Sequence, residues 1–171
     1  MSRYVAFLRG VSPSNASMPA LVAAFERAGF ANVRSILSSG NVAFDSRRAS
    51  NTTLAAKAEE GMREELGRSF PVIVRSTDDL RTLLASAPFD GHLIPTGAKR
   101  VVTFLGSTAA PRMPLPVSLD GATVLGVVGR EAFTYYERSS KGAVFMRLIE
   151  KALGTDVTTR TWESVERCST S

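Results

Sequence analysis

The sequence predicts an α+β fold built from two ferredoxin-like (βαββαβ-type) halves with antiparallel sheets, the second of which is incomplete. An apolar run at residues 4–8 opens the first half, and helical and β-prone segments then follow in the order βαββαβ. A second series begins near residue 99 and reads as a strand, a linker, two strands, a helix and a strand. The linker occupies the place of a helix, and three prolines prevent a regular helix there, namely Pro111, Pro114 and Pro116.

The first helix is predicted from a cap, a periodic apolar stripe and a stop. Ser17 is a favourable N-cap, and Gly29 is a typical helix terminator. Between them, apolar side chains recur at the spacing i, i+3, i+4 and i+7 of one helix face, at Met18, Leu21, Val22 and Phe25.

The remainder of the first half follows from a corner, a second helix and a strand. Two β-prone runs, residues 33–37 and 42–44, frame the Ser-Ser-Gly-Asn corner at 38–41. The second helix stops at Gly67, and residues 71–74 form the fourth strand. The cap of this second helix is one of Asn51, Thr52 and Thr53.

A third helix, capped by Thr77 and ended by Pro88, and a polar loop lead into the second half. A strand at 99–105 is followed by an irregular segment at 108–120, which leaves a sheet edge open for pairing with a second chain. The order then continues with a hairpin at 123–128 and 132–136, a helix around residues 145–152 ended by Gly154, a strand at 157–160 and a helical turn capped by Thr161.

These elements divide the chain into a ferredoxin-like half at 1–75, a connecting helix and loop at 76–98, and a second α/β half at 99–171. With 171 residues, a single compact domain is the alternative.

The charge of the chain is moderately basic. The net charge is +5, and residues 1–75 contribute +4 of it, with ten basic and six acidic side chains. Arginine dominates this excess, and arginine favours bidentate contacts with phosphates and carboxylates. No run of five or more basic residues is present, so composition alone does not indicate a nucleic-acid-binding protein.

Several classes of function are disfavoured. The chain has one cysteine, Cys168, and one histidine, His92, which argues against a disulfide and against a Cys/His metal site. Motifs of phosphate-binding loops, Rossmann cofactor sites, α/β-hydrolases and zinc enzymes are lacking, so we expect no cofactor and no metal. The apolar run at 4–8 is too short for a signal peptide and no run suits a membrane span, which predicts a cytoplasmic protein without membrane contact.

The motifs resemble a bacterial family that carries domain of unknown function 1697. The resemblance rests on RYVAFLRGV at 3–11, the block MPALVAAFERAGFANVRSILSSGNVAF at 18–44, VVGREAFTYY at 127–136, SSKGAVFMRLIEKALGT at 139–155 and TTRTWESVERC at 158–168. It implies paired α/β halves and a bacterial cytoplasmic setting, and it implies no established activity.

The chain departs from the family pattern at two places. Members continue as LRGINVGG, with a basic residue before the methionine, whereas residues 11–17 here contain neither the glycine pair nor the base. Glycines there would let the backbone approach a phosphate or carboxylate closely. Members also read SKL and RNW near the C-terminus, where this chain has SKG at 140–142 and RTW at 160–162.

Three candidate binding residues lie at predicted strand ends of the first half. Arg9 follows the first apolar strand and is placed to hold an anion, although a surface ion pair is the alternative. Ser39 and Asn41 can present a hydroxyl and an amide to a ligand, but a tight turn also favours Gly-Asn at this corner.

The second half contributes three further candidates. Lys141, in the run Arg138-Ser139-Ser140-Lys141 before a helix, can bind an anion together with the free N–H groups of the helix start. Arg160 and Trp162 can clamp a planar ligand by charge and stacking, although a packing role for the tryptophan is the alternative.

The leading hypothesis is a non-catalytic binding domain for an anionic or phosphorylated small molecule. The first alternative is an enzyme acting on an anionic substrate, in which Lys141 and Arg160 stabilise developing charge. The second is a nucleic-acid-binding sheet that uses Tyr4, Phe7 and Phe44, whose runs have the pattern of buried strands.

Overall fold

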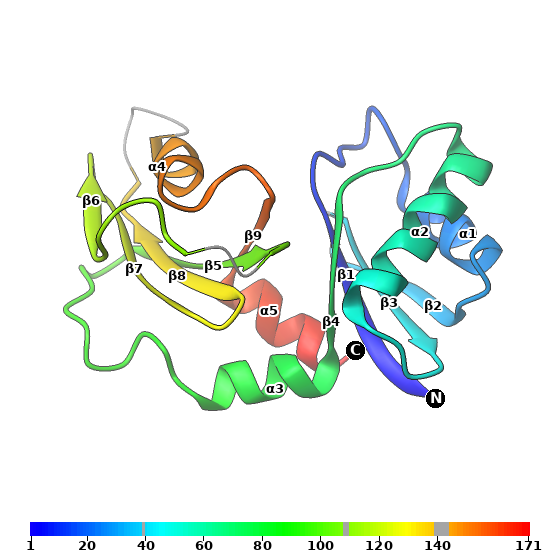
Figure 1. Ribbon diagram of the computed structural model, residues 1–171, viewed down its shortest axis with the longest axis horizontal. Coiled ribbons are helices and arrows are strands. Elements are labelled where there is room, and N and C mark those ends of the chain that lie inside the picture. The colour runs from blue at the N-terminus through cyan, green and yellow to red at the C-terminus, as the bar shows by residue number, and fades with distance from the viewer. Residues whose placement is uncertain (39, 108–109, 139–143) are drawn as a thin grey trace. The chain divides into compact units, whose positions relative to one another are not determined.

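The structure, a computed structural model, describes residues 1–38, 40–107, 110–138 and 144–171 (Figure 1). The chain divides into two compact units. The first comprises Met1–Ala85 together with Glu166–Ser171, and the second comprises Ser86–Val165. Within the described residues the two units contain two antiparallel sheets and five helices, which confirms the predicted α+β class.

The first unit has the predicted βαββαβ order followed by one further helix. Its four strands pair in the order β2-β3-β1-β4 and are all antiparallel, as in a ferredoxin-like sheet. The elements are β1 (Ser2–Leu8), α1 (Met18–Arg27), β2 (Ala31–Ile36), β3 (Asn41–Ser46), α2 (Asn51–Leu66), β4 (Val72–Ser76) and α3 (Thr77–Ala85).

The helix starts of the first unit confirm one predicted cap and correct two. The hydroxyl of Ser17 accepts a hydrogen bond from the N–H of Ala20, as expected. The second helix is capped by Ser50 instead of the three residues that follow it, because Ser50 is the residue with extended backbone and its hydroxyl bonds Thr53. The third is capped by Ser76, whose hydroxyl accepts the N–H of Asp79. Asn51 in the second helix and Thr77 in the third already have helical backbone, so neither can be the cap of its helix.

Helices α1 and α2 pack on one face of the four-stranded sheet. Alternate residues of β1 point into this core, where Tyr4, Ala6 and Leu8 join buried side chains of both helices. The helices approach closely at Gly61, because a Cβ atom there would overlap the carbonyl oxygen of Ala24.

The second unit has the predicted order with one additional strand. The strands pair in the order β6-β7-β8-β5-β9, so that β9-β5-β8-β7 repeats the neighbour pattern of the first sheet. The elements are β5 (Lys99–Leu105), β6 (Val117–Leu119), β7 (Ala122–Val128), β8 (Glu131–Tyr136), α4 (Val144–Leu153), β9 (Val157–Thr161) and the first residues of α5 (Trp162–Ser169), which from Glu166 on belongs to the first unit.

Strand β6 corrects the expectation that residues 108–120 are irregular throughout. It pairs with residues 122–124 of β7 and so covers part of the sheet edge expected to be bare. The pairing depends on contact with β7, because Val117–Leu119 is too short and too close to Pro116 to be recognised as a strand by itself.

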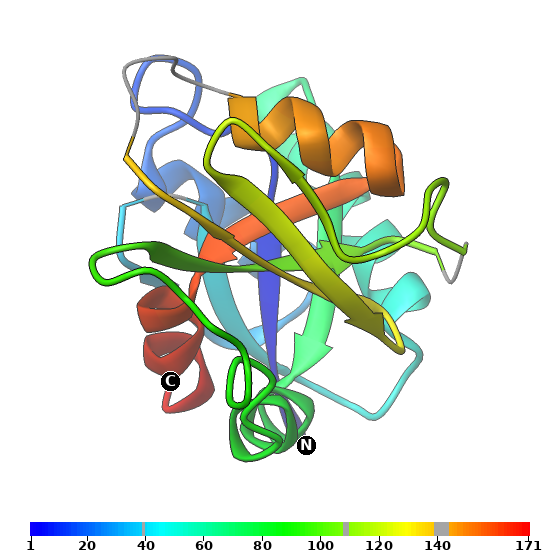
Figure 2. The ribbon, with the colours of Figure 1, turned by 90° about the vertical axis from the view of Figure 1, so that its left-hand side faces the viewer.

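One helix, α4, packs on one face of the five-stranded sheet. Figure 2 shows α4 (orange) along one side of the strands. Its buried residues Leu148 and Ile149 pack with Val124 of β7 and Leu105 of β5. At the helix start, the ring of Phe145 stacks on that of Tyr136 with centroids 4.3 Å apart.

Candidate functional site

In the first unit, Arg9 and Asn41 lie at the same end of the sheet. Strand β1 ends at Leu8, whose N–H donates to the carbonyl of Gly40, and the N–H of Arg9 donates to the carbonyl of Pro71. Asn41 faces Phe7 across the β1–β3 ladder and is completely buried. Its side-chain amide donates to the carbonyl of Ile36 at 3.1 Å. Asn41 therefore joins the ends of the β2–β3 hairpin, as expected of an asparagine in a tight turn.

The loop after Arg9 is closed by its own polar groups. The Asn15 side chain accepts the N–H of Ser12 at 2.8 Å and donates to the carbonyl of Gly10 at 2.7 Å. The hydroxyls of Ser12 and Ser14 also bond each other at 2.8 Å. This loop stands where family members carry the glycine pair, and its polar side chains bond within the loop.

In the second unit, Arg160 and Trp162 come together on the sheet face opposite α4. Val157 of β9 packs towards α4, so alternate residues place Arg160 on the other face. Arg160 lies opposite Val102 of β5, and Val102 lies opposite Phe133 of β8.

Phe89 and Arg100, which are not among the candidates predicted from the sequence, complete this surface. The ring of Phe89 meets Trp162 edge-on at 5.3 Å and Phe133 edge-on at 5.8 Å. The guanidinium of Arg100 lies over the Phe89 ring, 5.8 Å from its centroid. We call the surface formed by Phe89, Arg100, Arg160 and Trp162 the arginine–aromatic face.

Arg100 and Arg160 are diagonal neighbours on this face. Arg160 lies opposite Val102, and Arg100 lies two residues from Val102 along the same strand. Arg100 is exposed, whereas Arg160 is half-buried and donates to the carbonyl of Thr159 at 2.7 Å. Two planar cations and an indole on one surface can bind an anion and the flat ring attached to it.

The packing of Phe89 onto the domain could have been predicted from the sequence, whereas the role of Arg100 was less evident. Phe89 is the one aromatic residue in the polar segment 86–98, and an isolated aromatic residue in such a loop indicates that the loop packs onto the domain. Arg100 stands at the start of an apolar strand, but its proximity to Arg160 depends on the pairing of β5 with β9.

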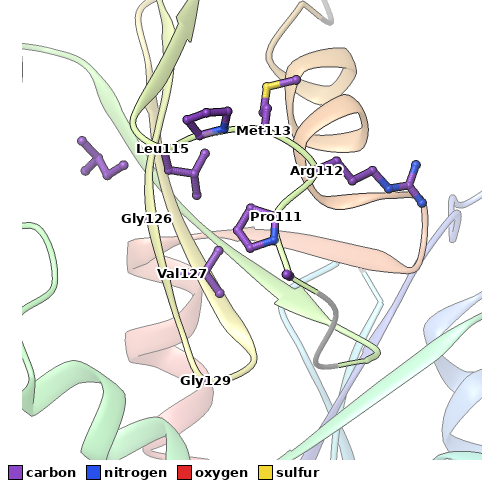
Figure 3. A pocket seen from close by; sticks show the side chains of 10 residues that line it. Pro111, Arg112, Met113, Leu115, Gly126, Val127 and Gly129 are labelled. Atoms are coloured by element: carbon purple, nitrogen blue, oxygen red, sulfur yellow. The ribbon is translucent and has the colours of Figure 1, made fainter.

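A hollow of about 810 Å³ lies beside the proline-rich segment of the same unit. Pro111, Met113 and Leu115 line it from one side, and Val127 lines it from β7 (Figure 3). Arg112 points away from these side chains, and its N–H donates to the carbonyl of Ala152 in α4 at 2.7 Å. Most of the described side chains that line it are apolar.

A polar hollow of about 670 Å³ lies in the first unit, near the starts of α2 and α3. Two of its three arginines have carboxylate neighbours: Arg3 bonds Asp45 at 3.1 Å and Arg81 bonds Asp78 at 2.9 Å. Because two of its three arginine charges are already paired, this hollow is a weak candidate for anion binding.

The pattern that defines the family described as "Protein of unknown function (DUF1697)" matches residues 1–125. The chain belongs to this family. The resemblance stated from the motifs is thereby confirmed. No curated protein matches the chain.

A solved structure shows the same fold as this family member. The conserved bacterial protein SP0830 from Streptococcus pneumoniae aligns with a TM-score of 0.70 and 17% sequence identity. The alignment covers 99% of this chain and 97% of that chain. At this identity the similarity concerns the fold.

Two of the binding residues predicted from the sequence, Ser39 and Lys141, lie outside the residues that the structure describes. Tyr4, Phe7 and Phe44, considered for nucleic-acid stacking, are at most 4% exposed and belong to the interior. Across the described residues, no helix is long and apolar enough to cross a membrane, and no group of three metal-ligating side chains of His, Cys, Asp or Glu is formed.

Proposed function

We propose that this protein is a non-catalytic binding domain for a small anionic ligand, which binds at the arginine–aromatic face. The observation that supports the proposal is the placement of Arg100 and Arg160 as diagonal neighbours beside Trp162. Guanidinium groups bind phosphates and carboxylates with paired donors, and they remain charged at any physiological pH. Such groups hold and orient an anion without transferring protons to or from it, which suits binding better than acid–base catalysis.

The aromatic part of the face favours a ligand that also has a flat ring. The Phe89 ring is buried and holds the Trp162 indole edge-on, whereas Trp162 itself is half-buried. A ring stacked on the accessible part of the indole would place an attached phosphate or carboxylate within reach of Arg160. The ligand class is therefore an aryl or heteroaryl phosphate or carboxylate.

Trp162 is the single tryptophan of the chain, so its fluorescence reports on this face. The probes are adenosine 5′-monophosphate, adenosine, citrate and inorganic phosphate, titrated at constant ionic strength. We expect a saturable change in emission with the monophosphate that adenosine does not reproduce. Arg100→Ala and Arg160→Ala should each weaken binding about tenfold or more, because each removes a charged hydrogen-bond donor.

Arg147→Ala is the matched control, since it removes an exposed arginine of the same unit from α4, on the other side of the sheet. It should bind the monophosphate like the wild type. The proposal is wrong if no probe gives a saturable response, or if all three arginine variants respond equally.

A further inference from the structure

Tyr135 of β8 is a further aromatic residue on the sheet face that carries the arginine–aromatic face. Its neighbour Tyr136 packs on the other side of the sheet, where its ring stacks on that of Phe145 in α4. Successive side chains of a strand point to opposite faces, so Tyr135 shares its face with Phe133, which meets the Phe89 ring edge-on. The Tyr135 side chain is half-buried, so part of it is accessible to a ligand.

Arg100 has Tyr135 on one side and Trp162 on the other. Tyr135 lies directly opposite Arg100 in the ladder between β5 and β8, and the Cβ atoms of such a pair are about 5 Å apart. The ladder between β5 and β9 ends where Val101 lies opposite Thr161, so the next residues of the two segments, Arg100 and Trp162, are also neighbours. The three residues form a row with the cation between two aromatic side chains.

The spacing of this row suits a ligand with two rings. Strand β5 lies between β9 and β8, and neighbouring strands are about 4.8 Å apart, so the two aromatic positions are separated by about 10 Å. A single ring stacked on the Trp162 indole would leave Tyr135 uncovered. Two rings joined through a phosphate can occupy both positions and place the phosphate at the exposed guanidinium of Arg100.

We propose that the ligand of the arginine–aromatic face is a dinucleotide unit, with one base on Trp162, the next base on Tyr135 and the phosphodiester between them on Arg100. The inference rests on the proposed function and narrows its ligand class from one ring to two. Bases stack on aromatic side chains whatever their identity, and guanidinium groups bind the backbone phosphate. A free dinucleotide and a longer single strand both carry this unit.

The experiment titrates the protein with adenosine 5′-monophosphate, the dinucleotide ApA and hexa-adenylate, followed by the fluorescence of Trp162. In the wild type, ApA should bind about tenfold more tightly than the monophosphate, although its phosphodiester carries less charge, because its second base stacks on Tyr135. A hexa-adenylate affinity equal to or above that of ApA would assign the ligand to a single strand, and a lower affinity would assign it to a free dinucleotide.

Two variants of Tyr135 test the second base position. Tyr135→Ala should weaken the binding of ApA about tenfold and leave the affinity for the monophosphate unchanged, which also shows that the rest of the face is intact. Tyr135→Phe keeps the ring and should bind both probes like the wild type.

The outcomes separate this inference from the proposed function. Equal wild-type affinities for ApA and the monophosphate, or a Tyr135→Ala variant that binds ApA like the wild type or weakens both probes equally, would overturn the inference and leave the proposed function in place. The wild-type comparison needs no variant, so it decides the question even if Tyr135→Ala does not fold. A protein that binds neither probe would overturn both.

Discussion

The indole of Trp162 and the ring of Phe89 meet nearly at right angles, at 85°, with centroids 5.3 Å apart. Trp162 begins α5, and Phe89 lies in the long segment before β5, so this contact attaches that segment to the start of α5. Phe89 is 4% exposed and also meets Phe133.

Phe89→Ala should lower the free energy of unfolding by about 3–5 kcal/mol, because it leaves a cavity beside two aromatic rings. Urea unfolding followed by tryptophan emission measures the loss, and the folded variant should emit at longer wavelength as Trp162 gains solvent. Leu93→Ala is the control in the same segment, since Leu93 is 99% exposed and should change neither quantity. An unchanged midpoint for Phe89→Ala would contradict the packing role.

Gly61→Ala should destabilise the first unit although alanine is the better helix former. A Cβ at Gly61 would overlap the carbonyl oxygen of Ala24 and lie 2.8 Å from the Cβ of Ala28, so α1 and α2 must separate. We expect a net loss of about 1–3 kcal/mol in denaturant unfolding. Thr52→Ala, at an exposed position of the same helix, should be neutral or slightly stabilising. Equal stability of the two variants would show that the helices are not in close contact.

Asp45 should contribute stability that is lost in acid. The amide of Asn32 donates to its carboxylate at 2.7 Å and Arg3 lies at 3.1 Å, and these contacts lower the pKa of Asp45 below its ordinary value. A lowered pKa means that the folded state favours the charged carboxylate. The contribution is therefore complete above the unfolded-state pKa of about 3.9 and is lost as pH falls through the lower pKa of the folded state.

The check is the difference in unfolding free energy between wild type and Asp45→Asn as a function of pH. The difference should be constant near neutral pH and should shrink below pH of about 4. Asp78→Asn is the comparison, because its ion pair with Arg81 is exposed and should contribute little at any pH. A difference for Asp45→Asn that does not vary with pH would contradict the assignment.

Asn41→Asp should be more harmful than Asn41→Ala. The buried amide donates to the carbonyl of Ile36, whereas a carboxylate would place negative charge against that oxygen. The alanine variant should lose about 1–3 kcal/mol in denaturant unfolding, and the aspartate variant should lose more. Ser38→Ala, exposed in the same turn, is the control. If Asn41→Ala were as stable as Ser38→Ala, the amide would not hold the hairpin.

Local sequence patterns predicted most elements because each has its own signal. The stripe from Met18 to Phe25 and the Gly67 stop each agree with the structure, and Gly67 has a left-handed backbone with φ of 70°. The predicted caps lie one or more residues after the observed caps Ser50 and Ser76, because the neighbouring Asn and Thr residues have a similar capping preference. Strand β6 was missed because its three residues form a strand through pairing with β7.

Local patterns along the chain suffice to predict the α+β class, the family and the order of strands and helices, since these depend on periodicity and on motifs within short stretches. Which polar residues come together depends on the pairing of strands that are distant in sequence. Strand pairing places Arg100 diagonally to Arg160, and it buries Asn41 within a hairpin. The physical reason is that these neighbours lie on strands that are distant in sequence. The register in which such strands pair decides which residues lie beside one another on a sheet face.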